Sequence, residues 1–184
     1  MTPPNLKAKE FEQLILDAGK RDHRIEIDRY GVQVSLIAGE WRPIQSLPDF
    51  DGVLEQGRQF IMEAKTNSKT SLTLDKKHIK PRQIKHMLKR SRMGVPCFLI
   101  VHFNEFELKT KTHPAITVAV PVNDEDERWE LLSTGKSAGS LGRSEACAMG
   151  DVITWSVPPR CQKALPDIAG LFYPKSQCCL NESL

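Results

Sequence analysis

Two short motifs in the first half of the chain carry residue types that could hydrolyse a phosphate ester. Pro48-Asp49 is separated from Glu63-Ala64-Lys65 by thirteen intervening residues. Side chains two positions apart on a β-strand point to the same face, so Glu63 and Lys65 would lie together. Two carboxylates can hold Mg²⁺, which lowers the pKa of a bound water, and the lysine can orient that water or neutralise the phosphate. This set of groups favours phosphodiester hydrolysis.

The Glu-x-Lys motif is weak evidence by itself, because such a pair on a strand is more often a surface ion pair. The charge that follows it adds weight. Ten Lys and Arg residues and one acid, Asp75, lie between residues 65 and 92, whereas the formal net charge of the whole chain is only +3. This basic segment is consistent with an anionic partner bound at one place. On charge alone, a solvated basic helix face without a partner is an equally good interpretation.

Hydrophobic periodicity predicts the elements that must position these groups. In order, they are a helix over 6–18 that stops at Gly19, a hairpin over 24–37 that turns at Tyr30-Gly31, a polar connection over 39–48, a second hairpin over 49–65, a helix over 81–93, and strands over 97–103 and 115–122. This order predicts an α/β fold with a mixed β-sheet flanked by helices. We expect a nuclease core over residues 1–123 and a C-terminal extension over 124–184.

Composition and short motifs exclude other classes. The chain is 40% hydrophobic and 27% charged, as in ordinary globular proteins. No apolar run approaches the ~18 residues of a membrane span, and the N-terminus has no secretory signal. Five scattered cysteines favour reduced thiols and a cytoplasmic protein. Gly135-Lys136-Ser137 matches the end of a nucleotide-binding P-loop, but Glu130 stands where the first glycine is required, which excludes that motif.

The region around the two acidic motifs resembles a known family. The segments that carry the resemblance are Ser46–Val53, Gly57-Arg58, Glu63-Ala64-Lys65, Gln83-Ile84-Lys85-His86-Met87 and Gly94–Phe103. They are similar to RecU-type Holliday-junction resolvases, which belong to the PD-(D/E)xK nuclease superfamily. The resemblance implies a restriction-endonuclease-like fold, a divalent metal (Mg²⁺, with Mn²⁺ as a substitute) and symmetric cleavage of four-way DNA junctions by a homodimer in recombination or repair.

The resemblance also implies roles for individual residues. Asp49 and Glu63 would be metal ligands, and Lys65 the catalytic lysine. The family's acidic residue on the first helix matches Glu12, within Phe11-Glu12-Gln13-Leu14-Ile15, and Gln83 matches a helix glutamine near the active site. Asp51 is a lesser candidate, for which solvation near a turn is favoured. The residues expected to contact DNA are Lys69, Lys85, His86, Lys89 and Arg90.

One departure from the family concerns the recognition of junctions. RecU proteins carry a long projecting stalk before the Pro-Asp strand, whereas the connection from Gly39 to Pro48 has only ten residues. We therefore expect a dimer that prefers branched DNA by a smaller margin than full-length family members do. Trp41 and Arg42 are expected to contribute to this preference. Two alternatives are a PD-(D/E)xK nuclease that acts on flaps, ends or duplex, and a non-catalytic protein that binds DNA through the basic helix.

Overall fold

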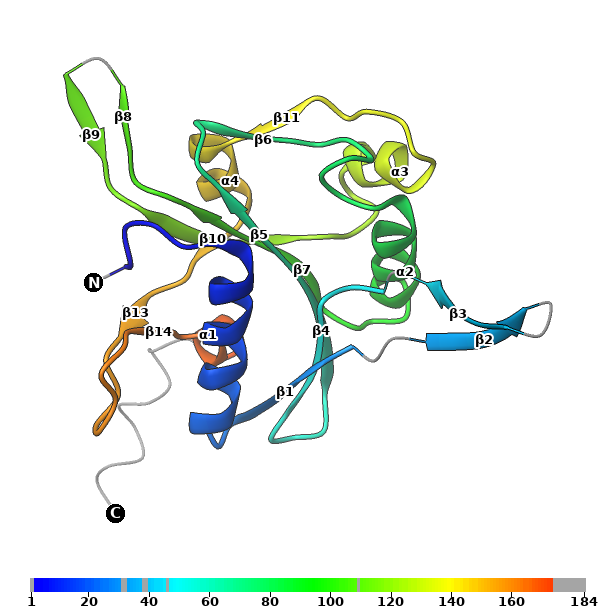
Figure 1. The fold of residues 1–184 in the computed structure, drawn as a ribbon, viewed down its shortest axis with the longest axis horizontal. Helices are drawn as coiled ribbons and strands as arrows, with labels where there is room; N and C mark the ends of the chain where they lie inside the picture. Colours follow the sequence, from blue (N-terminus) through cyan, green and yellow to red (C-terminus); the bar gives the residue numbers. More distant parts are fainter. Residues whose placement is uncertain (1, 31–32, 38–39, 46, 109, 174–184) are drawn as a thin grey trace.

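A six-stranded mixed sheet forms the centre of the molecule (Figure 1). The computed structural model describes residues 2–30, 33–37, 40–45, 47–108 and 110–173, with backbone only for 33–37 and 41–45. The strand order is β1 (Ile25–Arg29), β4 (Phe50–Leu54), β5 (Gln59–Asn67), β7 (Cys97–Phe103), β10 (Ile116–Pro121) and β12 (Asp151–Val152). Neighbouring strands are antiparallel except β5 and β7, which are parallel. The sheet confirms the predicted α/β class and is consistent with a restriction-endonuclease-like fold.

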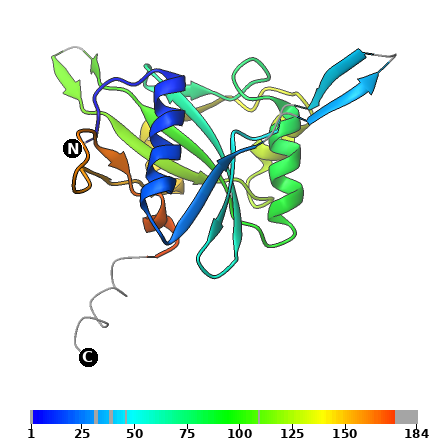
Figure 2. The ribbon, with the colours of Figure 1, turned by 60° about the horizontal axis from the view of Figure 1, so that its bottom comes forward.

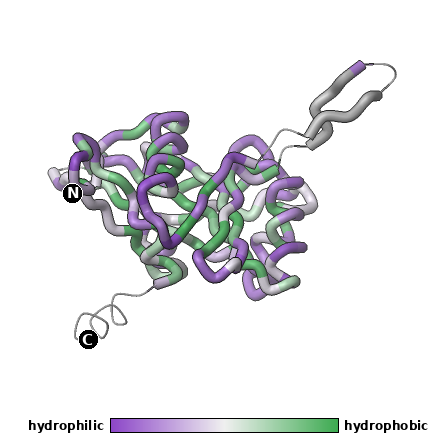
Figure 3. Tube along the Cα trace, turned by 90° about the horizontal axis from the view of Figure 1, so that it is seen from below, coloured by the Kyte–Doolittle hydropathy of each residue, from purple (hydrophilic) through white to green (hydrophobic). Residues whose placement is uncertain are grey.

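Helices cover both faces of this sheet. On one face, Phe60, Met62 and Ala64 of β5 belong to the same core as α1 (Ala8–Arg21). On the other face, Ile61 packs in a second core with α2 (Pro81–Ser91), α3 (Glu127–Ser133) and α4 (Arg143–Met149). Hydrophobic segments accordingly run through the middle of the body, and hydrophilic segments lie at its periphery (Figure 3).

The two predicted helices form close to their predicted bounds. Phe11, Leu14, Ile15 and Ala18 are the buried face of α1, as the periodicity predicts. The predicted stop at Gly19 is wrong, because the helix continues to Arg21. A Cβ at Gly19 would lie 2.8 Å from the Cβ of Ile27, so glycine is needed here for the close approach of β1 rather than to end the helix.

The predicted hairpin over residues 24–37 is also wrong. β1 pairs with β4, with Ile27 opposite Gly52, whereas β2 (Gln33–Ile37) pairs with β3 (Glu40–Gln45). Alternation correctly assigns Ile25 and Ile27 to the buried face, but it does not specify which strand is the neighbour. The segment predicted as a polar connection is therefore largely strand β3.

The β2–β3 hairpin forms an arm that projects from the body (Figures 1 and 2). The backbone N–H of Tyr30 donates to the carbonyl of Asp49 at 3.0 Å, so the chain leaves and re-enters the body at one place. The arm is longer than the expected ten-residue connection, because β2, which was predicted to pair with β1, forms its other strand. Trp41 and Arg42 lie on the β3 backbone, but their side chains fall outside the described part of the chain.

The chain after β10 returns to both cores. β12 extends the sheet, and α4 and part of α3 pack in the core that contains α2. Strands β13 (Trp155–Ser156) and β14 (Leu165–Pro166) and the short helix η1 (Ala169–Leu171) pack in the core that contains α1. Four further short strands were not predicted. They are β6 (Ser71–Thr73), which pairs with β11 (Ser140–Gly142), and β8 (Phe106–Leu108), which forms a hairpin with β9 (Lys111–His113). No helix in the described part of the chain could span a membrane.

The position of the arm predicts that it can be removed without loss of the fold. Tyr30 and Asp49 are hydrogen-bonded to each other at the base of the arm. Replacement of residues 33–45 by two glycines should therefore leave the central sheet intact. We expect a melting temperature within ~4 °C of the wild type, which corresponds to about 1 kcal/mol for a chain of this size. Circular dichroism with thermal unfolding measures this. Loss of the cooperative transition would contradict it.

Candidate active site

Two carboxylates meet where β4 begins beside β5. Asp49 directly precedes β4, and the ladder that pairs Phe50 with Met62 brings it next to Glu63. The backbone N–H of Asp49 donates to Glu63 Oε2 at 3.1 Å, and the backbone N–H of Ala64 donates to Asp49 Oδ2 at 2.9 Å. Glu63 is fully buried and Asp49 is partly buried. The backbone of each strand thus fixes the side chain on its neighbour.

Lys65 and Gln83 complete the contacts of the Glu63 carboxylate. Lys65 Nζ donates to Glu63 Oε1, which agrees with the predicted shared face of the two side chains. Gln83 Nε2 lies 2.8 Å from Glu63 Oε2 and 3.0 Å from the carbonyl of Leu47. The Gln83 Oε1 in turn accepts from the backbone N–H of Lys80 at 3.2 Å, in the first turn of α2. Gln83 therefore connects α2 to β5 through hydrogen bonds.

Burial dominates the electrostatics of this site and disfavours the charged form of both carboxyls. Burial raises the pKa of Glu63 from 4.5 to about 7, the charge of Lys65 opposes this rise, and the charge of Asp49 adds to it. Burial also raises the pKa of Asp49, against the effect of Lys65 and the Ala64 N–H, while Glu12 adds a further increase. Lys65, together with the more distant Arg29, does not fully offset the cost of burying two carboxylates that share a poorly solvated site.

This donor set fits a hard divalent cation. Mg²⁺ prefers oxygen ligands and is commonly held by one or two carboxylates, with waters and substrate phosphates in its other positions. Asp49 and Glu63 could provide the two carboxylates, and a cation beside them would offset the uncompensated charge. Within the described residues, no three His, Cys, Asp or Glu side chains gather closely enough to hold a metal ion. The fit is therefore to a two-carboxylate site.

Glu12 lies apart from this cluster in an ion pair. Its Oε2 accepts from Arg29 Nη1 at 2.6 Å, which joins α1 to the end of β1. Its charge still reaches Asp49, whose pKa it raises. The lesser candidate, Asp51, is exposed on β4 opposite Asp28. The structure thus brings Asp49, Glu63, Lys65 and Gln83 together, and it holds Glu12 with Arg29.

The five residues expected to contact DNA have different surroundings. Lys69, Lys85 and Lys89 are exposed. Arg90 donates to Gln59 Oε1. His86 is partly buried, with its Nε2 3.2 Å from the hydroxyl of Tyr30, and burial together with the charges of Arg90 and Lys89 lowers its pKa. The positive charge available to a phosphate is therefore concentrated on the three exposed lysines rather than on His86.

Sequence reasoning missed Arg29 and Tyr30 beside the site. Arg29 holds Glu12, and Tyr30 contacts both the carbonyl of Asp49 and the ring of His86. No motif marks either residue, because both contacts join segments that are far apart in the sequence. The end of β1 was placed correctly as a strand, but its neighbours could not be deduced from alternation.

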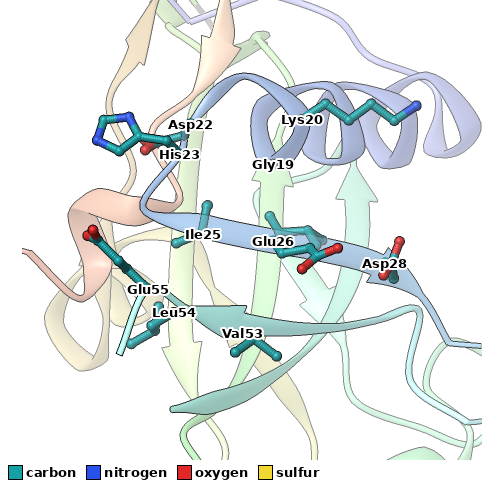
Figure 4. Close-up of a pocket in the computed structure, with 11 residues that line it drawn as sticks. Gly19, Lys20, Asp22, His23, Ile25, Glu26, Asp28, Val53, Leu54 and Glu55 are labelled. Carbon is teal, nitrogen blue, oxygen red and sulfur yellow. The ribbon is translucent and has the colours of Figure 1, made fainter. Parts of the chain in front are cut away.

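A hollow lies at the open edge of β1, and none of the expected catalytic residues lines it (Figure 4). Its volume is about 560 Å³, and it is lined by the end of α1, by β1 and by the turn after β4. Its charged side chains are mostly acidic, and they include Asp22, Glu26, Asp28 and Glu55. Such a surface repels anions, so it is not suited to bind a phosphate.

The raised pKa of Glu63 predicts a change in stability with pH. A carboxyl whose pKa rises from 4.5 to about 7 on folding binds its proton more tightly in the folded state, which corresponds to about 3 kcal/mol at most. Wild-type stability is therefore lost as pH rises from about 4.5 through about 7. We expect Glu63→Gln to gain stability relative to the wild type between pH 5 and pH 8, in metal-free buffer. Urea unfolding at both pH values measures this, and a difference between the two proteins that does not change with pH would contradict it.

One family model matches the region that contains this site. The RecU model, described as Recombination protein U, matches residues 25–112, slightly less than half of the chain. The matched region runs from β1 into β9 and includes Asp49, Glu63, Lys65 and Gln83, whereas α1 and the chain after β9 lie outside it. No curated protein matches the chain. Residues 25–112, which hold the carboxylate cluster, are therefore similar to the RecU family of recombination proteins.

Proposed function

We propose that this protein is a Mg²⁺-dependent endodeoxyribonuclease that cuts four-way DNA junctions in recombination or repair. The observation that carries the proposal is the cluster of Asp49, Glu63, Lys65 and Gln83 inside the RecU match. A protein that only binds DNA has no use for two carboxylates next to a phosphate, because they repel it. The carboxylates favour hydrolysis over simple binding.

Each residue of the cluster has a distinct part in this proposal. Asp49 and Glu63 hold the Mg²⁺, or Mn²⁺ in its place, which supplies an activated water and screens the charge that develops on the phosphate. Lys65 is partly exposed and lies beside Glu63, where its ammonium can neutralise a phosphate oxygen or orient the water. Gln83 fixes the Glu63 carboxylate through its amide. Glu12 remains a proposed third carboxylate, and it must share its oxygens with Arg29.

The arm and a two-fold dimer would provide selectivity for junctions. A four-way junction presents two equivalent strands for cleavage, and a homodimer places two equivalent sites across it. The arm begins next to Asp49, through the contact of Tyr30, so it projects from the edge of the proposed catalytic site. We infer that the arm contacts the branch point. A comparison of wild type and the arm deletion tests this on a four-way junction, a flap and plain duplex in Mg²⁺.

The expected result is that the wild type is a dimer that cuts the junction fastest. The arm deletion keeps its activity on duplex but loses most of the preference for the junction. If the wild type is a monomer that cuts linear duplex as readily as junctions, the alternative of a nuclease for flaps, ends or duplex replaces this proposal.

Substitutions in the cluster are expected to abolish cleavage while DNA is still bound. Asp49→Asn, Glu63→Gln and Lys65→Ala remove groups that act on the phosphate or the metal. Each should therefore lower the cleavage rate by more than the ~10–100-fold expected for Gln83→Ala, because Gln83 only holds Glu63 in place. Glu12→Gln costs less than Asp49→Asn, because its carboxylate is shared with Arg29. The loss of negative charge leaves DNA affinity equal or tighter. Rates of junction cleavage and binding isotherms measure these effects.

Asp51→Asn provides the matched control, since Asp51 is an exposed carboxylate on the same strand, two residues from Asp49. We expect nearly wild-type cleavage from this variant. Full activity in Asp49→Asn or Glu63→Gln, or cleavage by the wild type in EDTA, would refute the proposed metal site.

The exposed lysines of α2 are expected to contact DNA phosphates. Lys85 and Lys89 are one helical turn apart on the same exposed side. Each lost phosphate contact lowers the slope of log K against log salt by about 0.9 for duplex DNA. We therefore expect Lys85→Ala/Lys89→Ala to weaken binding to all DNA forms and to reduce the slope by up to about 1.8. Lys20→Ala, at the acidic hollow, is the control. An unchanged slope in the double variant would mean that α2 does not face DNA.

A further inference from the structure

A loop from outside the family match joins the surface next to the proposed active site. The β6–β11 ladder pairs Thr73 with Ser140, and it is continued by hydrogen bonds from Leu74 N to Gly139 O and from Ala138 N to Leu74 O, both 2.9 Å (Figure 1). At the other end of the loop, a Cβ at Gly135 would lie 3.6 Å from Cγ of Pro81. The segment 135–139 is therefore held along the segment 74–81.

Two glycines give this loop its shape. Gly135 and Gly139 both have φ of +82°, a left-handed conformation that favours glycine. Lys136 lies between them, and its backbone N–H donates to the carbonyl of Leu131 at 3.1 Å. The Gly-Lys-Ser segment thus does not form a nucleotide-binding loop. It holds an exposed lysine beside the chain that leads into α2.

We call the exposed part of residues 75–80 and 135–139 the two-loop surface. Its exposed lysines are Lys76, Lys77, Lys80 and Lys136. Its one acid, Asp75, is engaged by the ring of His78 at 2.8 Å and by the backbone N–H of Lys77 at 2.9 Å. On the neighbouring α3, Glu130 pairs with Arg92. The two-loop surface therefore carries a clear excess of positive charge.

This surface is connected directly to the proposed catalytic cluster. The backbone N–H of Lys80 donates to Gln83 Oε1, and the same Gln83 side chain donates to Glu63. A DNA strand whose phosphate lies against Glu63 and Lys65 continues with further phosphates on either side. Duplex DNA carries one negative charge per ~1.7 Å of axis. A duplex that reaches the proposed catalytic cluster would therefore bring further phosphates toward the two-loop surface, which begins three residues before Gln83.

We propose that the two-loop surface binds the phosphate backbone of the duplex arm that flanks the cleaved phosphate, with Lys136 as a phosphate contact supplied by the chain outside the RecU match. This inference rests on the proposed nuclease function. It assigns a role in recognition of DNA to a segment that the family match does not reach. The other possibility is that these lysines are solvated and have no partner, and the experiment below distinguishes the two.

The test is a charge reversal at Lys136 in the full-length protein. Binding of a fluorescent four-way junction with duplex arms is measured by anisotropy, without divalent metal, between about 50 and 200 mM salt. We expect Lys136→Glu to weaken binding about tenfold and to lower the salt slope by about 0.9, whereas Lys136→Arg keeps wild-type affinity because it keeps the charge. The matched control is Lys163→Glu, at an exposed lysine two residues before β14. Figure 1 shows β13 and β14 on the side of the molecule away from α2 and α3. It should bind as the wild type does.

Three results would overturn the inference. Wild-type affinity and slope in Lys136→Glu would show that the loop is only solvated. Equal weakening by Lys136→Glu and Lys163→Glu would assign the effect to net charge rather than to this surface. Failure of the wild type itself to bind DNA would refute the proposed function together with this inference, whereas the first two results leave junction cleavage by the wild type intact.

Discussion

The burial of Glu63 beside Asp49, with the Lys65 ammonium paired to Glu63, is the constraint around which the rest of the structure is arranged. Transfer of a carboxylate from water is costly unless it is hydrogen-bonded and paired. Glu63 meets this requirement with three donors, from Lys65, Gln83 and the Asp49 backbone. These donors come from β5, α2 and the start of β4, so the site exists only when the sheet and the helix are assembled. The pKa of about 7 shows that the compensation is incomplete.

The remaining elements follow from this centre. β5 lies between β4 and β7 and is buried on both faces, which fixes the position of the strand that carries Glu63 and Lys65. α1 is held against β1 by Gly19 and Ile27, and by the ion pair of Glu12 with Arg29. The arm starts after Tyr30, which is hydrogen-bonded to Asp49. The two-loop surface ends at Lys80 on the side of α2, and Lys80 is hydrogen-bonded to Gln83. Both proposed DNA-contacting regions are therefore attached directly to residues of the carboxylate cluster.

Sequence patterns predicted those features that depend on the local direction of side chains. The shared face of Glu63 and Lys65, the buried face of α1 and the start of α2 at Pro81 follow from periodicities of 2 and 3.6 residues. The neighbour of β1, the arm and the pairing of Glu12 with Arg29 did not follow, because they depend on which distant segments meet. The chain after residue 123 was poorly readable because its strands are two or three residues long and show no periodicity.

The proposal that depends most directly on this geometry is that Asp49 and Glu63 together bind a divalent cation. Thermal unfolding with and without Mg²⁺ at pH 8 tests it most directly, because a ligand that binds only the folded state raises the melting temperature. We expect Mg²⁺ to raise the melting temperature of the wild type, and to leave that of Asp49→Asn/Glu63→Gln unchanged. A wild type that does not respond, or a double variant that responds equally, would contradict the account.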